Sequence, residues 1–250
     1  LTMTNEGTSA LDTLLPTLNP GLRVEEIAME GNALAYRRDE HLLRVAVVQP
    51  LAPADTVRFQ LAYRGRIDER FCYLDVEEER LEAQYRLFLH SVPKRYSMVT
   101  ADFLHLTPET GWYPRAGVPT GTAFPERGHR DYADYEISVA VPDGWSAFSQ
   151  GAAETDSLAG VTRFRTEKPL PQVSLTMGEY EVRELEVEDI TYRLAIRPGH
   201  DYFDTYLDSV SGALPDLITE LRNEYEVRLG MDYPHSRFSL VETPIQFFAY

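Results

Sequence analysis

The feature that most constrains the fold is a period of two in short apolar runs. In the stretch 57–63 (VRFQLAY) a large apolar side chain stands at every second position, which indicates a strand with one buried face. Further runs lie at 42–48, 135–141 and 161–166, with Pro and Gly between them. Short strands at intervals of about 8–12 residues predict an antiparallel β-sandwich or barrel.

An earlier apolar stretch, at 22–29, does not keep the period of two along its whole length. Leu22 and Val24 begin an alternation that Ile27 and Met29 resume one position late. We still expect a strand here. The turn residues of Leu18-Asn19-Pro20-Gly21 come just before it and mark where the chain enters the sheet.

The stretch 201–229 changes the period from two to three or four. Its apolar positions fit one face of an α-helix: Phe203, Leu207, Val210, Leu214, Leu217, Leu221 and Tyr225. Asp201 is the expected N-cap and Gly230 the residue after the last turn. Pro215 leaves open a kink or a division of the helix. An apolar run at 238–244 predicts a further strand.

The change of period divides the chain near Glu188. We expect a mostly β protein, with an antiparallel β-sandwich at 1–187 and the opening strand, helix and strand of a truncated α/β domain at 188–250. A helix with so wide an apolar face needs a partner. We therefore expect the stretch 201–229 to pack on the sandwich, on a missing C-terminal part of its own domain, or on a second copy of the chain.

The charge balance excludes some partners. The chain has 40 acidic and 24 basic side chains and a net charge of -16. Nucleic acid and anionic membrane surfaces require a basic face, so neither is expected as the main partner. We expect no membrane span, because no run of about 18 apolar residues occurs.

The chain carries no recognisable catalytic or metal motif. Cys72 is its single cysteine, and a buried apolar role is favoured over that of a nucleophile. None of the six histidines is followed by Glu, so the His-Glu-x-x-His zinc motif is absent. The acidic run at 77–79 fits the start of a helix better than a metal site. A Ser/His/Asp triad stays open, because its members are assembled in space.

An irregular stretch at 103–132 is rich in Gly and Pro, and long loops in compact domains are often functional. Trp112 and Tyr113 lie in it. They are either a binding platform or, as we favour, aromatic side chains that fix the loop to the core. The platform alternative would make this a carbohydrate-binding sandwich, which leaves the long helix unexplained.

Several segments, in order and spacing, resemble the N-terminal part of the aminopeptidase N family of zinc metallopeptidases. They are Tyr63-Arg64-Gly65-Arg66-Ile67, 135–151 (YEISVAVPDGWSAFSQG), 173–180 (VSLTMGEY), 225–234 (YEVRLGMDYP) and 238–244 (FSLVETP). The resemblance spans most of the chain. It implies that a β-sandwich is followed by the truncated start of a thermolysin-like domain.

The same resemblance implies a parent protein that hydrolyses peptides with a zinc ion. In the family, a Gly-x-Met-Glu-Asn segment and then the zinc helix follow the position of Pro244, whereas this chain continues as IQFFAY. No catalytic or metal-ligating residue can therefore be carried over to a numbered position. We expect the chain to be inactive by itself and to hold no zinc. Its candidates for a substrate cleft are Trp112, Tyr113, Glu242 and Gln246.

The stretches Trp112-Tyr113-Pro114 and 241–248 resemble a bacterial branch in which a peptidase-like region is attached to an ABC-type permease. That resemblance implies a parent that is extracytoplasmic or membrane-associated, with this part as a soluble piece. It also leaves an alternative function, an interaction or scaffold domain of a transporter that keeps a peptidase-like fold.

Overall fold

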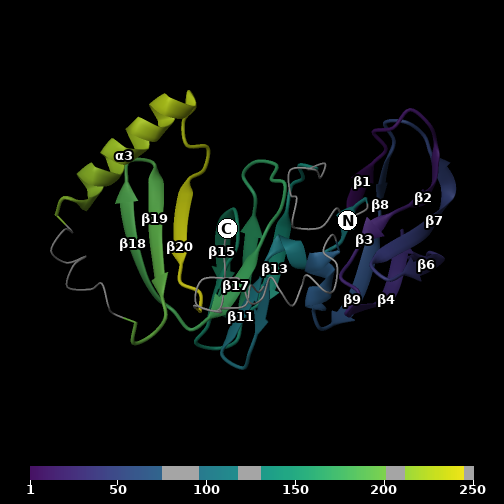
Figure 1. Ribbon diagram of the computed structural model, residues 1–250, viewed down its shortest axis with the longest axis horizontal. Helices are drawn as coiled ribbons and strands as arrows, with labels where there is room; N and C mark the ends of the chain where they lie inside the picture. Colours follow the sequence, from purple (N-terminus) through teal and green to yellow (C-terminus); the bar gives the residue numbers. More distant parts are fainter. Residues whose placement is uncertain (75–95, 118–130, 201–211, 245–250) are drawn as a thin grey trace. The chain divides into compact units, whose positions relative to one another are not determined.

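The computed structural model describes residues 1–74, 96–117, 131–200 and 212–244 (Figure 1). This part of the chain is mostly β and contains one α-helix, which confirms the expected fold class. It forms two compact units that are described separately. Unit 1 comprises Leu1–Met98, Leu106–Asp131 and Gln246–Tyr250, and unit 2 comprises Val99–His105 and Tyr132–Ile245. The helix start expected at 77–79 lies outside the described residues.

Unit 1 is built from antiparallel strands. They are β1 (Thr2–Thr4), β2 (Leu11–Leu14), β3 (Pro16–Thr17), β4 (Leu22–Met29), β5 (Asn32–Ala33), β6 (Tyr36–Asp39), β7 (Leu42–Leu51), β8 (Thr56–Arg58), β9 (Gln60–Gly65) and β12 (Arg115–Ala116). One sheet has the order β12-β3-β7-β2, with β6 on β7; the others are β5-β4-β9 and β1-β8. Two short 3-10 helices, η1 (Glu69–Tyr73) and η3 (Pro108–Thr110), also lie in this unit.

The core of unit 1 lies between the sheets. Ile27 comes from β4 and Val45 from β7, and both side chains are buried together with Leu18 and Phe59. Inward-facing apolar residues from two sheets are what a β-sandwich requires. The expected sandwich is therefore present in this unit.

The slip in the first apolar run is a β-bulge. The register of β4 against β9 shifts between Val24 and Glu26. One extra residue in one strand restores the alternation on the far side of the bulge. Val24 and Ile27 are consequently both buried, although they lie three positions apart.

The run 57–63 alternates as expected but is not one strand. β8 ends at Arg58 and β9 begins at Gln60. Between them, the Phe59 N–H donates to the Leu1 carbonyl at 2.9 Å and the Leu1 amine donates to the Phe59 carbonyl at 2.8 Å. β8 pairs with β1 and β9 with β4, so the run passes from one sheet to another.

The remaining strands form three sheets. They are β10 (Ser97–Val99), β11 (Phe103–Leu106), β13 (Glu136–Ala140), β14 (Ser146–Phe148), β15 (Ala152–Asp156), β16 (Val161–Arg165), β17 (Leu175–Gly178), β18 (Glu181–Val187), β19 (Ile190–Ile196) and β20 (Arg237–Val241). The sheet orders are β10-β11-β17-β14, β13-β16-β15 and β18-β19-β20. β11 lies in the stretch that the sequence predicted to be irregular.

The last sheet contains a parallel pairing, between β19 and β20. β18 pairs antiparallel with β19 along its whole length. The domain boundary expected between 187 and 188 falls between these two paired strands, and it stays a prediction.

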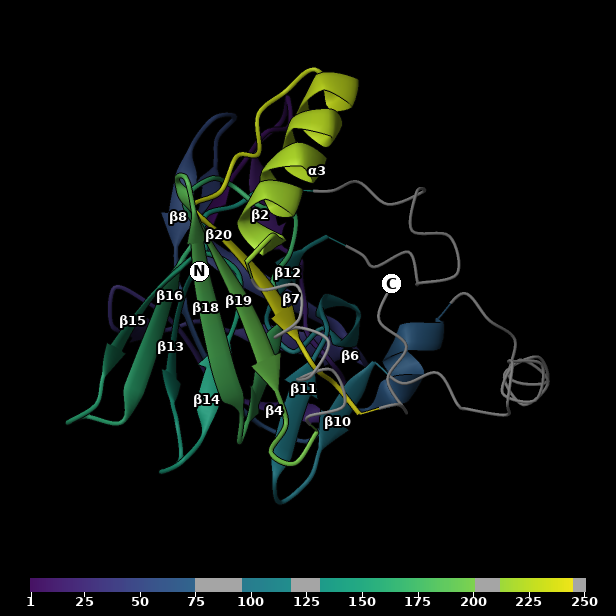
Figure 2. The ribbon, with the colours of Figure 1, turned by 90° about the vertical axis from the view of Figure 1, so that its left-hand side faces the viewer.

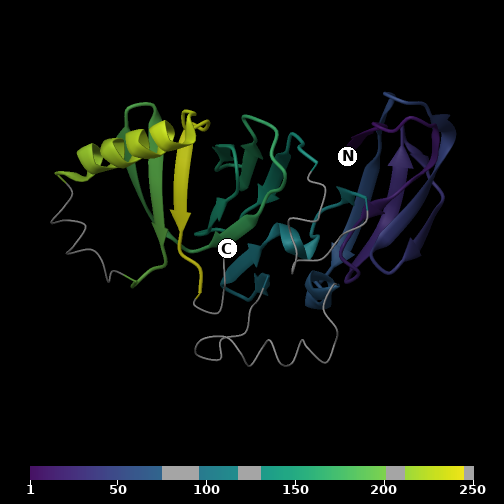
Figure 3. The same cartoon turned by 45° about the horizontal axis from the view of Figure 1, so that its top comes forward.

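Helix α3 (Leu214–Leu229) runs alongside β18, β19 and β20 (Figures 2 and 3). Gly230 ends it in the left-handed region, with φ at 67°, as expected. Pro215 does not kink α3, because it lies in the first turn, where no backbone N–H is needed. Asp201 lies outside the described residues. A continuous helix from 201 is wrong, however, because Gly212 and Ala213 form a turn.

Candidate functional site

The loop that carries Trp112 and Tyr113 is fixed to the rest of unit 1 at Gly111. This residue has φ at 60°, and a Cβ atom on it would lie 2.7 Å from the Phe71 ring. Only glycine fits both the left-handed backbone and the contact. The Tyr63 hydroxyl donates to the Trp112 carbonyl at 3.0 Å, and burial raises the pKa of Tyr63.

The two aromatic candidates contact each other. The rings of Trp112 and Tyr113 pack edge to face, with centroids 4.8 Å apart and an interplanar angle of 82°. The indole Nε1 of Trp112 is buried, and no hydrogen-bond acceptor reaches it among the described residues. The backbone contacts favour the fixed-loop interpretation. The role of the pair as a binding platform stays a prediction.

Asn19 positions this loop from a distance in sequence. Its fully buried side chain donates to the carbonyls of Thr110 at 2.7 Å and Asp68 at 3.0 Å. Its Oδ1 accepts from the N–H groups of Gly21 and Asp68, both at 2.9 Å. The sequence identified Asn19 as a turn residue, but nothing in it pointed to partners so far along the chain.

Glu242 follows β20 in unit 2 and is held by four contacts. Its carboxylate accepts the Arg197 N–H at 2.7 Å and lies 2.5 Å from His200 Nδ1. Its backbone N–H donates to Ala195 at 2.9 Å, and its carbonyl accepts from the Tyr180 hydroxyl at 2.8 Å. Burial raises the pKa of Tyr180, so this hydroxyl remains a donor at neutral pH.

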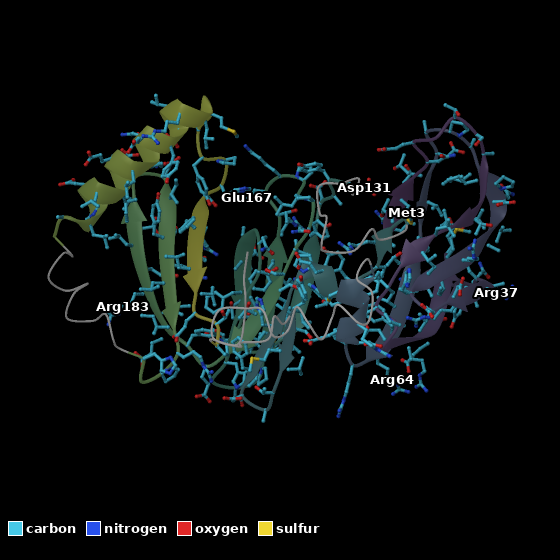
Figure 4. The ribbon with its side chains drawn as sticks, in the orientation of Figure 1. Met3, Arg37, Arg64, Asp131, Glu167 and Arg183 are labelled. Carbon is cyan, nitrogen blue, oxygen red and sulfur yellow. The ribbon has the colours of Figure 1, made fainter. Side chains whose placement is uncertain are left out.

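The other end of β20 is held by a second carboxylate. Glu167, labelled in Figure 4, accepts hydrogen bonds from the hydroxyl and from the backbone N–H of Ser236, the latter at 3.1 Å. The bond from the Ser236 hydroxyl lowers the pKa of the Glu167 carboxyl. β20 is therefore fixed at both its entry and its exit.

Arg197 extends the contacts around Glu242. Its guanidinium forms an ion pair with Asp102 at 2.9 Å and lies over the Phe103 ring, 5.5 Å from the centroid. The hydrogen bond from Thr100 and then the one from Arg197 lower the pKa of Asp102. Arg197 thus contacts Glu242 after β20 through its backbone N–H, and Phe103 at the start of β11 through its guanidinium.

His105 in β11 is a buried histidine that the sequence analysis did not single out. Its Nδ1 lies 2.7 Å from the Thr176 hydroxyl on β17. Burial lowers the pKa of His105 to about 4, so the imidazole is neutral at pH 7. Its position in the sheet indicates a structural role. The short apolar run at 103–106 (FLHL) was the signal that could have placed it on a strand.

The predicted site residues are divided between the two units and the part of the chain outside the described residues. Trp112 and Tyr113 belong to unit 1, Glu242 belongs to unit 2, and Gln246 lies outside the described residues. Trp112, Tyr113 and Glu242 do not line the open groove of about 440 Å³ in unit 2. That groove contains the ion pair between Arg193 and Glu184.

The described residues do not fit a zinc site. No group of three or more His, Cys, Asp or Glu side chains could hold a metal ion in the described ranges. His200 and Glu242 are in contact, but a structural or catalytic zinc ion requires at least three protein ligands. Cys72 is buried, as expected of a small apolar side chain. The described helix is not long and apolar enough to cross a membrane.

Solved structures identify the fold. An M1 zinc metallopeptidase from Deinococcus radiodurans matches 98% of this chain with a TM-score of 0.65 and 18% sequence identity. A mutant M1 zinc metallopeptidase from Deinococcus radiodurans, bound to a Tyr-Ser-Ala substrate, matches 98% of the chain with a TM-score of 0.61 and 19% identity. A two-domain M1 zinc metallopeptidase mutant bound to L-tryptophan matches 79% of it with a TM-score of 0.56 and 21% identity.

The matches concern about half of each similar structure, because the chain covers 51%, 51% and 43% of the three respectively. No protein-family model and no curated protein matches the chain. The chain therefore has the fold of the matched half of these M1 metallopeptidase structures.

Proposed function

We propose that this chain is the non-catalytic front part of an aminopeptidase N-like zinc metallopeptidase. The observation that carries the proposal is the match of 98% of the chain to M1 zinc metallopeptidase structures, over 51% of their length. The zinc ion and the hydrolysis belong to the parent protein, and no step of that reaction is assigned to the residues of this chain. We propose a peptide as the parent's substrate, since one similar structure holds Tyr-Ser-Ala.

Within the parent, we propose that this chain supplies part of the wall of the substrate cleft. Trp112 and Tyr113 offer aromatic surface on a loop that glycine and asparagine contacts hold in place. Glu242 offers a half-buried carboxylate at the end of a strand fixed at both ends. Gln246 is proposed as the fourth residue on the basis of the sequence resemblance alone.

The experiment is to sequence the gene beyond the codon for Tyr250 and to purify the longer product. A peptidase parent is expected to carry a His-Glu-x-x-His helix, to contain about one zinc ion per chain, and to lose aminopeptide hydrolysis on chelation. In the 250-residue chain, titration calorimetry with zinc at neutral pH is expected to show no tight site. One tight site there would overturn the non-catalytic assignment.

The same experiment decides the alternative. A longer product without the zinc motif, but with membrane spans on either side of this region, would overturn the peptidase proposal. It would make the chain a scaffold or interaction domain of a permease instead.

A further inference from the structure

Helix α3 packs on its sheet through a side of mixed character. Its half-buried positions are Leu214, Pro215, Ile218, Thr219, Arg222 and Glu226. The Arg222 side chain is 16% exposed and pairs with Glu188 and, at 3.0 Å, with Asp189 in the turn between β18 and β19. Glu226 accepts the Tyr233 N–H at 2.8 Å. The ion pairs of Arg222 therefore join this helix to the turn between β18 and β19.

A line of apolar side chains on α3 lies beside these half-buried positions and is exposed. Leu217, Leu221 and Tyr225 are 52%, 48% and 62% exposed. They lie four positions apart, so they form one line along the helix, which we call the α3 stripe. The sequence analysis expected this line to be buried. No side chain of α3 is buried among the described residues.

An ordinary surface helix turns its apolar stripe to the core and its charges to water. Burial of a Leu side chain stabilises a protein. The three large apolar side chains of the α3 stripe are exposed, so they do not contribute this stabilisation. Exposed apolar patches of this kind mark contact surfaces.

We propose that the α3 stripe is the docking surface for the part of the parent polypeptide that completes the peptidase-like domain, through an apolar face of that part. This inference rests on the proposed function. The similar solved structures are about twice as long as their matched region, since this chain covers 51% of them. A second copy of the chain is disfavoured as the occupant, because each copy carries a net charge of -16.

The test compares amide hydrogen exchange of residues 214–229 in the 250-residue chain and in the longer gene product. Docking is expected to slow exchange in α3 at least tenfold in the longer product. Leu221→Gln is expected to reverse that protection there and to leave exchange in the 250-residue chain unchanged. Gln is a good helix former, so the variant alters the contact and not the helix.

Val227→Gln is the matched control on the same helix. Val227 is 84% exposed and stands six positions after Leu221, roughly 120° around the helix axis. The Val227→Gln variant should leave the protection of α3 from amide hydrogen exchange unchanged in the longer product. Equal exchange of α3 in the two proteins would overturn the proposal.

A second copy as the occupant would give a different result. The 250-residue chain would then sediment as a dimer that Leu221→Gln dissociates, and this outcome also overturns the proposal. Neither measurement depends on zinc or on hydrolysis. A longer product that protects α3 but lacks the zinc motif would therefore sink the peptidase function and leave the docking surface in place.

Discussion

The carbonyl oxygen of Gly21 lies 2.2 Å from the point that a Cβ atom on Gly65 would occupy. A Cβ atom on Gly21 would also lie too close to the other strand, at 2.0 Å from the Arg66 carbonyl oxygen. The Arg66 N–H donates to the Gly21 carbonyl at 3.2 Å. Because both residues are glycines, the start of β4 and the end of β9 can approach each other backbone to backbone.

Gly65→Ala is therefore expected to destabilise unit 1. The new methyl group would meet a backbone carbonyl, and φ at 151° is unfavourable for any residue with a Cβ. We expect the free energy of unfolding to fall by about 2–4 kcal/mol, measured by urea denaturation. Gly212→Ala, at a position with open space around it, should stay within about 0.5 kcal/mol of the parent chain.

Asn19→Ala is expected to loosen the attachment of the loop that carries Trp112. The change leaves the carbonyls of Thr110 and Asp68 and the N–H groups of Gly21 and Asp68 without their buried partner. We expect a loss of about 3 kcal/mol and faster proteolysis of the loop. Asn32→Ala, which removes one exposed and long hydrogen bond, is the control. Equal effects of the two changes would contradict the role given to Asn19.

Trp112→Phe tests the unpartnered indole nitrogen. Phe keeps an aromatic ring and removes the buried N–H, so the free energy of unfolding should be unchanged or rise by about 1 kcal/mol. Trp112→Ala should lower it by about 3 kcal/mol through lost packing. Guanidinium denaturation measures the free energy of unfolding of both variants. A loss of more than about 1 kcal/mol in Trp112→Phe would show instead that the N–H has a partner.

His105 predicts a dependence of stability on pH. Its pKa is about 4 in the folded chain against 6.5 for an exposed histidine. Between these values the unfolded chain binds the additional proton, so stability falls as the pH is lowered from 6.5 to 4. The loss is at most on the order of 3 kcal/mol. Denaturation at pH 7.5, above the ordinary pKa of 6.5, and at pH 4.5, between it and the folded pKa of about 4, measures most of it.

His105→Gln removes the titrating group and is expected to flatten that part of the pH profile while the Thr176 contact can still form. An unchanged profile in the variant would assign the pH dependence to other groups.

The sequence by itself determined the features that depend on neighbours along the chain. The period of two placed β4, β7, β8, β9, β13 and β16, and the slip after Val24 marked the bulge in β4. Gly230 marked the end of α3. These signals are local, because side-chain alternation and backbone conformation are properties of a few consecutive residues.

Only the tertiary structure decided the contacts between distant residues. Asn19 meets Thr110 across 91 positions, and Glu242 meets His200 across 42. The sequence showed that α3 has an apolar side but not which side the sheet would take. In the structure, the sheet side carries Arg222, whose partners Glu188 and Asp189 lie in the turn between β18 and β19. Periodicity describes one element at a time, whereas packing depends on which elements meet.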